Sequence, residues 1–148
     1  MIALVQRVKR SSVKIENRLV NKIDKGLNIL VGISKDDSYD DIQKLIKKIV
    51  NLRIFPNKDG KMSLSIKDIN AKALVVSQFT LVADIKKGRR PSFDNAMPPK
   101  EAKILYDNFC KELEKIIEVR RGVFGALMEV EIINDGPVTF IIDSKDLP

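Results

Sequence analysis

The chain has 148 residues, of which 44% are hydrophobic and 32% charged, proportions typical of one folded domain and not of a disordered chain. It contains no histidine and one cysteine, which excludes Ser-His-Asp and Cys-His nucleophile systems, an intrachain disulfide and a zinc cluster built by one chain. Its 27 basic and 20 acidic side chains give a net charge of +7, which favours a polyanionic partner. We therefore expect a single domain over residues 1–148 that uses no metal and no other cofactor.

The beginning of the sequence does not resemble a targeting segment. The apolar run Met1–Val5 is interrupted by Gln6 and Arg7, whereas a secretory signal has a longer apolar run with its charge in front. No stretch approaches the roughly 20 apolar residues that span a bilayer. We expect a cytoplasmic protein without membrane contact.

Short segments rich in Val and Ile predict β-strands in the first part of the chain. They cover residues 1–8, 12–16, 18–23 and 27–33. The last of these is an almost continuous apolar run, which is typical of a strand covered on both faces. Further strands are predicted at 63–66, 71–83, 127–133 and 138–142.

Two segments have apolar residues at helical spacing. The first begins near Ser38 or Asp40, either of which can cap a helix, and ends near Arg53. The second is opened by Pro98 and Pro99, since proline is tolerated in a first helical turn. Residues 84–99 form a long loop. The order of elements predicts an α/β layered single domain with mixed, partly barrel-like β-sheets and two main helices.

Ser77-Gln78-Phe79-Thr80 places two hydroxyls and an amide at the end of an apolar strand. These polar side chains can simply face solvent. As nucleophiles the hydroxyls need a base, and no histidine is present. Backbone N–H groups at this strand end can instead form an oxyanion hole.

Asn134-Asp135-Gly136-Pro137 is predicted to be a turn joining two strands. A second interpretation gives it a role in binding, because glycine lets a backbone approach a ligand closely and a Gly-Pro bond can be cis. A rigid Gly-Pro pair can then present its carbonyl groups to a substrate.

A basic cluster lies in the long loop and consists of Lys86, Lys87, Arg89 and Arg90. Such a cluster is usually a solvated surface. With the net charge and the length of the loop, contact with phosphates becomes an equally good interpretation. Phe93 just beyond it can pack beneath the loop or stack on a base.

Taken together, the segments Ser77–Leu81 and Asn134–Thr139 are similar to those of the D-aminoacyl-tRNA deacylase family. The resemblance runs from Met1 to about Asp143 in order and at family spacing. It includes the segments Met1–Val8, Arg53–Phe55, Gly60–Met62, Gly88–Phe93 and Gly122–Ala126.

This resemblance implies hydrolysis of the ester that joins a D-amino acid to the terminal adenosine of tRNA, and clearance of glycine from mischarged tRNA. It also implies a homodimer whose sites combine Ser77–Thr80 of one subunit with Gly136 and Pro137 of the other. Arg7 would hold the Gly-Pro segment, while Phe124 and Met128 match positions associated with the adenosine. A rigid Gly-Pro wall would reject L-amino acids by steric exclusion, and we expect its peptide bond to be cis.

Two alternatives remain open from the sequence. One is a module that binds RNA ends without chemistry, supported by the basic loop. The other is a small-molecule hydrolase that uses Thr80 or Ser77 as its nucleophile.

Overall fold

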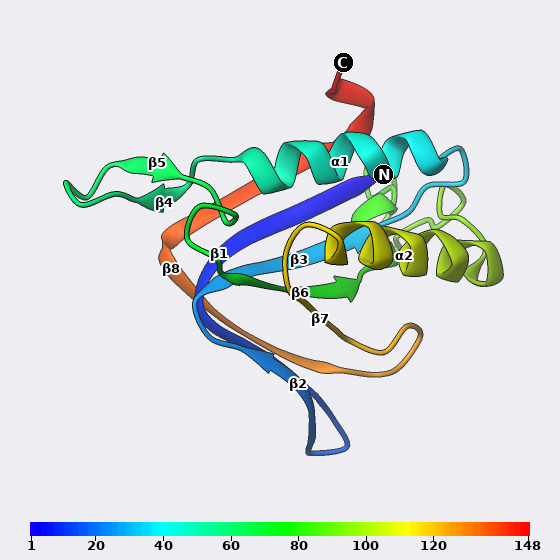
Figure 1. The fold of residues 1–148 in the computed structure, drawn as a ribbon. Coiled ribbons are helices and arrows are strands. Elements are labelled where there is room, and N and C mark those ends of the chain that lie inside the picture. Colours follow the sequence, from blue (N-terminus) through cyan, green and yellow to red (C-terminus); the bar gives the residue numbers. More distant parts are fainter.

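A six-stranded mixed sheet is the centre of the computed structural model, which describes all 148 residues (Figure 1). Its strands are β1 (Ile2–Ile15), β2 (Arg18–Ile23), β3 (Gly26–Gly32), β6 (Lys72–Ser77), β7 (Val119–Arg121) and β8 (Glu129–Asp143). One edge of β1 pairs with β8, while its other edge pairs first with β3 and then with β2. The strands β3, β6 and β7 are parallel. Because β1 bends where it passes from one partner to the next, the sheet curves into a partly closed barrel, as predicted.

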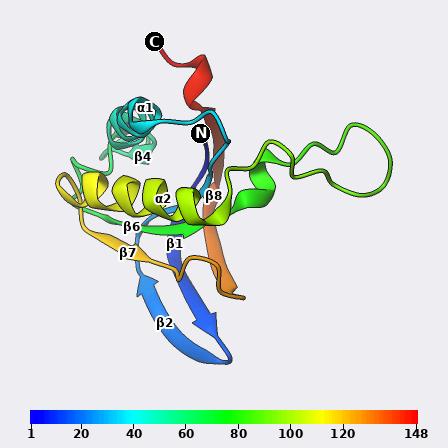
Figure 2. The ribbon, with the colours of Figure 1, turned by 90° about the vertical axis from the view of Figure 1, so that its right-hand side faces the viewer.

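Both predicted helices are present and lie against the same face of the sheet (Figures 1 and 2). They are α1 (Tyr39–Asn51) and α2 (Pro99–Glu114). The short strands β4 (Phe55–Pro56) and β5 (Met62–Leu64) form a separate hairpin, and two 3-10 helices are η1 (Phe79–Val82) and η2 (Ser144–Asp146). Neither main helix is long and apolar enough to cross a membrane.

The main core fills the space between the helices and the sheet. Its largest fully buried side chains include Tyr106 and Phe109 from α2 and Phe55 from β4. A smaller cluster occupies the opposite, concave side of the sheet and consists of Val8, Val13, Ile23, Leu74 and Val76. Burial of these two sets of apolar side chains is the main force that holds the curved sheet in shape.

The strand predicted over residues 71–83 is too long. β6 ends at Ser77, and the chain then turns into η1. Apolar residues continue from β6 into η1, so the sequence pattern did not mark the boundary. The consequence is that Phe79 and Thr80 lie in a helical turn, not in a strand.

The prediction of a turn between two strands at residues 134–137 is wrong. β8 runs continuously through this segment, and both of its halves pair with β1. Asn134 pairs with Val8 and Thr139 with Gln6, so residues 135–138 bulge out opposite Arg7 alone. A bulge accommodates proline, which has no N–H to give to the ladder.

Asp41 in the first turn of α1 is buried and makes the fold sensitive to acid. Burial by itself raises the pKa of this carboxyl, but hydrogen bonds from Ser144, Ser38 and Lys145 outweigh it. The pKa is therefore held well below its ordinary value of 3.8. The pKa of this carboxyl is lower in the folded than in the unfolded chain. The carboxylate therefore stabilises the fold fully at pH values above the unfolded pKa, and this stabilisation is lost as the pH falls through the folded pKa.

We expect Asp41→Asn to lower the stability at neutral pH and to flatten its dependence on pH between about 5 and 2. The measurement is denaturant unfolding followed by circular dichroism over this range. The exposed neighbour Asp40 provides the control variant Asp40→Asn. Equal acid dependence in Asp41→Asn and the unmodified chain would contradict the role given to this carboxylate.

Candidate active site

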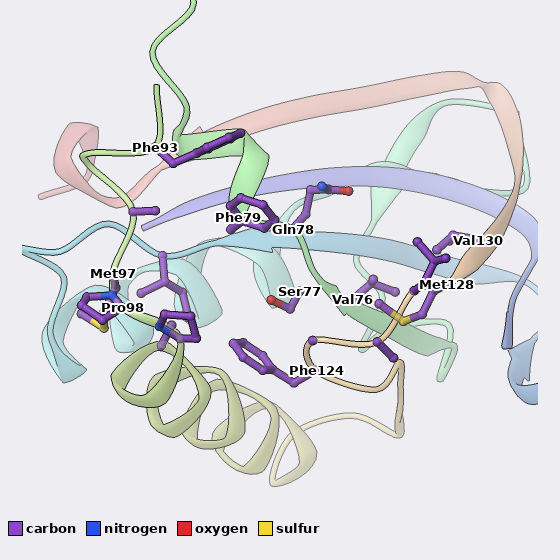
Figure 3. A pocket seen from close by; sticks show the side chains of 17 residues that line it. Val76, Ser77, Gln78, Phe79, Phe93, Met97, Pro98, Phe124, Met128 and Val130 are labelled. Carbon is purple, nitrogen blue, oxygen red and sulfur yellow. The ribbon is translucent and has the colours of Figure 1, made fainter. Parts of the chain in front are cut away.

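A cavity of about 610 Å³ opens at the carboxyl end of β6 (Figure 3). Three parts of the chain contribute to it: the end of β6 with the first residues after it, the segment leading into α2, and the loop before β8. Among the predicted site residues it collects Ser77, Gln78, Phe79, Phe124 and Met128. The structure therefore brings these five residues together, whereas Thr80 does not line the cavity.

The segment Ser77–Thr80 is fixed by its backbone. The Gln78 N–H donates to the carbonyl oxygen of Val31 at 2.8 Å, which continues the pairing between β3 and β6. Phe79 and Thr80 then begin η1, where the first N–H groups of a helix have no partner within it. The side-chain amide of Gln78 donates to the hydroxyl oxygen of Thr80. Of the two residues that begin η1, Phe79 lines the cavity and Thr80 does not.

Gly32 at the end of β3 allows η1 to come close to the sheet. A Cβ built on Gly32 would lie 2.8 Å from the Cβ of Leu81 and 3.0 Å from the carbonyl oxygen of Gln78. Contacts this short are not tolerated, so any side chain at position 32 would push η1 outward. The sequence analysis missed this residue because the contact joins segments far apart in the chain.

No side chain that lines the cavity ionises. The thiol of Cys110 is buried beside the core, and burial raises its pKa to about 12. Burial likewise raises the pKa of Tyr106. The cavity can therefore position and polarise a substrate, but it holds no general base of its own.

Phe124 rests on a rigid support. Its ring lies 5.6 Å from that of Tyr106, whose hydroxyl donates to the carbonyl oxygen of Val75 at 3.0 Å. Tyr106 is thus linked to β6 two residues before Ser77. The sequence analysis did not identify this supporting role of Tyr106, nor did it identify four residues that line the cavity, which are Met97, Pro98, Leu127 and Val130.

Gly136 and Pro137 lie exposed on the bulge of β8, and the peptide bond between them is cis, as expected. Arg7 holds the bulge: its Nε donates to the carbonyl oxygen of Asp135 at 2.9 Å and its Nη1 to that of Ile54 at 2.7 Å. The side chain of Asn134 closes the bulge by accepting from the Val138 N–H at 2.7 Å. These contacts agree with the position expected for Arg7.

The bulge does not approach the Ser77–Thr80 segment of its own chain. Arg7 pairs with Leu27, and Leu27 with Ala73, which lies four residues before Ser77 in β6. Four residues at about 3.3 Å each place the bulge and Ser77 about 13 Å apart along the strand direction. Across the sheet, β1 and β3 lie between β8 and β6. Within one chain the Gly-Pro bulge therefore lies apart from the Ser77–Thr80 segment.

The basic cluster forms an arm outside the cavity. Lys86, Lys87, Arg89 and Arg90 are all exposed, and none of them lines the cavity. The segment between η1 and α2 extends away from the sheet and helices in Figure 2. We call residues 85–91 the basic arm.

Comparison with known proteins shows to which family the chain belongs. The family described as D-Tyr-tRNA(Tyr) deacylase matches residues 4–143. The chain belongs to the D-aminoacyl-tRNA deacylase family. It is an enzyme that hydrolyses the ester bond of aminoacyl-tRNA and takes part in the quality control of translation, as the resemblance in the sequence implied.

Relatives named D-aminoacyl-tRNA deacylase match over almost the whole chain. The protein of Nitratiruptor sp. is 60% identical over 99% of this chain and 100% of its own length. The protein of Persephonella marina is 59% identical with the same coverage, and that of Aquifex aeolicus is 51% identical.

Solved structures support the same fold. A structure described as c-Myc DNA Unwinding Element Binding Protein superposes with a TM-score of 0.93 at 39% identity, covering 97% of this chain and 98% of that one. A probable eukaryotic D-amino acid tRNA deacylase superposes with a TM-score of 0.82 at 18% identity, covering 96% of this chain and 98% of that one, and at this identity it shows the fold alone. The predicted deacylase-like α/β fold is thereby confirmed.

Proposed function

We propose that this deacylase is a homodimer in which Gly136 and Pro137 of one subunit complete the cavity of the other. The observation that carries the proposal is the separation within one chain of the Gly-Pro bulge from the Ser77–Thr80 segment, about 13 Å along the strands. We call these two segments the half-sites. A two-fold pair brings each bulge to the partner's cavity with one repeated interface. Exposed apolar side chains on β8 next to the bulge, Phe140 and Ile141, supply surface for that interface.

The chemistry we propose relies on positioning and on backbone donors. An aminoacyl ester is already activated, so the cavity needs to hold it and to stabilise the oxyanion rather than to supply a strong nucleophile. The N–H groups of Phe79 and Thr80 are the donors, and the 2′-hydroxyl of the terminal adenosine assists the reaction. The adenosine itself occupies the part of the cavity next to Phe124 and Met128.

The proposed selection against L-amino acids depends on a rigid surface formed by the Gly136-Pro137 segment. With the amino group and the ester anchored, an L side chain points where a D-amino acid has only hydrogen. The carbonyl groups of Gly136 and Pro137, held by Arg7, would occupy that direction and exclude the L side chain. Glycine has no side chain to collide, so glycine on tRNA(Ala) is also a substrate in this proposal. The place of action is the cytoplasm, where aminoacyl-tRNA is used.

Incubation with D-Tyr-tRNA and L-Tyr-tRNA tests the proposed function. Hydrolysis of the D form with rejection of the L form supports it. Binding without hydrolysis would favour a nucleic-acid-binding module, a role suggested by the net charge and by the name of the DNA-binding relative. Hydrolysis of simple esters without RNA would favour a small-molecule hydrolase that uses Thr80 or Ser77.

Replacement of Thr80 separates the backbone scheme from a threonine nucleophile. We expect Thr80→Ala to retain at least about a tenth of kcat, because the hydroxyl has no base beside it and accepts only from Gln78. The measurement is single-turnover hydrolysis of D-Tyr-tRNA. Loss of several orders of magnitude with intact tRNA binding, or an acyl group trapped on Thr80, would favour the nucleophile instead.

The basic arm is proposed to bind tRNA phosphates. Replacing Arg89 and Arg90 together by Ala is expected to weaken tRNA binding and to reduce the slope of log K against log salt by about 1.5, the value for two lost phosphate contacts. Turnover at saturating tRNA should change less. The measurement is a filter-binding titration at several salt concentrations, and an unchanged slope would assign these residues to a solvated surface.

A further inference from the structure

Two exposed aromatic rings stand at the open end of the cavity. The centres of the Phe79 and Phe93 rings lie 4.9 Å apart, and the ring planes are inclined at 55°. The exposed fraction is 54% for Phe79 and 41% for Phe93. Figure 3 shows them together, away from Met128 and Val130 at the other end. Phe124 packs against Tyr106, whereas the rings of Phe79 and Phe93 face solvent. Phe79 and Phe93 therefore form a separate apolar surface next to the proposed adenosine position.

Phe93 lies between this cavity and the basic arm. It lines the cavity, and it directly follows Ser92, which exchanges two backbone hydrogen bonds with Asp84 at 2.8 and 2.9 Å. These two bonds close the base of the arm. An RNA strand that leaves the cavity toward the arm therefore passes the ring of Phe93 first.

An exposed aromatic ring next to a row of cations suits single-stranded nucleic acid. The face of a base stacks on the ring, while the phosphates that follow contact the cations. None of the four cations of the arm is engaged in a salt bridge with an acidic side chain of the chain, so their charge is available to a ligand. Stacking of this kind tolerates any base.

We propose that Phe93, supported by Phe79, stacks on the base of the nucleotide that precedes the terminal adenosine of tRNA. The basic arm then takes the phosphates farther along the acceptor strand. This site rests on the proposed deacylase function and adds a second nucleotide position to it. It gives the enzyme a grip on the end of tRNA that does not depend on which amino acid is attached.

Substrates of different length test this site. The D-tyrosyl ester of adenosine reaches only the cavity, whereas the D-tyrosyl ester of the trinucleotide CCA also reaches Phe93. We expect the unmodified enzyme to gain in kcat/KM from the longer substrate. In Phe93→Leu this gain should fall by about tenfold, the size typical of one base stacked on an aromatic ring. Phe93→Tyr keeps the ring and should keep the gain, and so should Tyr39→Leu, which removes an exposed aromatic ring outside the cavity.

A binding measurement reports the stack directly. The probe is a non-hydrolysable amide analogue of D-tyrosyl-CCA that carries pyrrolo-cytosine before the terminal adenosine, because stacking quenches the fluorescence of this base. We expect quenching with the unmodified enzyme and with Phe93→Tyr, and little with Phe93→Leu. Circular dichroism confirms that each variant is folded.

The outcomes separate this inference from the proposed function. If neither ester nor D-Tyr-tRNA is hydrolysed, the proposed function is wrong and the stacking site is wrong with it. If the esters are hydrolysed but the gain is equal in Phe93→Leu and the unmodified enzyme, only the stacking site is overturned. A Phe93→Leu variant that weakens the dimer and leaves the quenching unchanged would assign the ring to the subunit interface and also overturn the site.

Discussion

Gly136→Ala is expected to lower kcat/KM for D-Tyr-tRNA by about 100-fold or more. The φ angle of Gly136 is +138°, a conformation that side chains disfavour. A Cβ at this position would lie 2.8 Å from Cγ2 of Val138 and 3.1 Å from Nη2 of Arg7. The bulge must therefore move, and a displacement of about 1 Å at a reacting centre has an effect of this size.

Gly60→Ala is the matched control for this variant. Gly60 also has a positive φ, of +78°, but nothing lies within 4 Å of a Cβ built on it. It belongs to the exposed loop between β4 and β5, away from both half-sites. Single-turnover hydrolysis of the D and L substrates is the measurement for both variants. Normal D hydrolysis and normal L rejection in Gly136→Ala would remove the bulge from the mechanism.

The second large effect is expected for Gly32→Ala, in which kcat should fall by about 100-fold. The backbone of Gly32 does not have a positive φ, so alanine brings no backbone strain and acts only through its contacts. Those contacts fall on Leu81 and on the carbonyl oxygen of Gln78, and they displace η1 with the donors of Phe79 and Thr80. The measurement is single-turnover kcat with the folded fraction checked by circular dichroism, and a folded variant with unchanged kcat would show that the position of η1 does not matter.

These two variants together test the shared site. In the proposed dimer, Gly136→Ala would damage the half-site given to the partner, and Gly32→Ala would damage the half-site that receives it. After unfolding and refolding an equal mixture, about half of the dimers are mixed, and each mixed dimer has one undamaged site. Recovery of about a quarter of the unmodified rate is expected. No recovery beyond the sum of the two variants would contradict a site made by two subunits.

The helices were predictable from the sequence, because apolar residues at helical spacing must face a core. Ser77–Thr80 became a candidate site only through its similarity to the family, since nothing in its local pattern distinguishes it from a solvent-facing strand end. The cavity around it was less accessible to prediction. Met97, Pro98 and Leu127 come from loops whose mutual contacts depend on the whole fold.

The bulge of β8 shows a physical limit of local patterns. Gly136 and Pro137 are residues that usually end a strand, and the sequence therefore predicted a turn. The pairing of residues on both sides with β1 overrides that tendency, and Arg7 and Asn134 replace the lost ladder bonds with side-chain contacts. These partners lie up to 128 positions apart in the chain, so no window of sequence contains them together.

In the proposed dimer, β1 would also fix the distance between the two active sites. Its residues Ala3 and Arg7 lie level with Ser77 and with the start of β6. One continuous strand would therefore set the spacing between the half-site that a subunit keeps and the half-site that it gives to its partner. A strand paired on both edges cannot stretch. An insertion in this part of β1 would therefore misalign both active sites at once, however well each subunit folded.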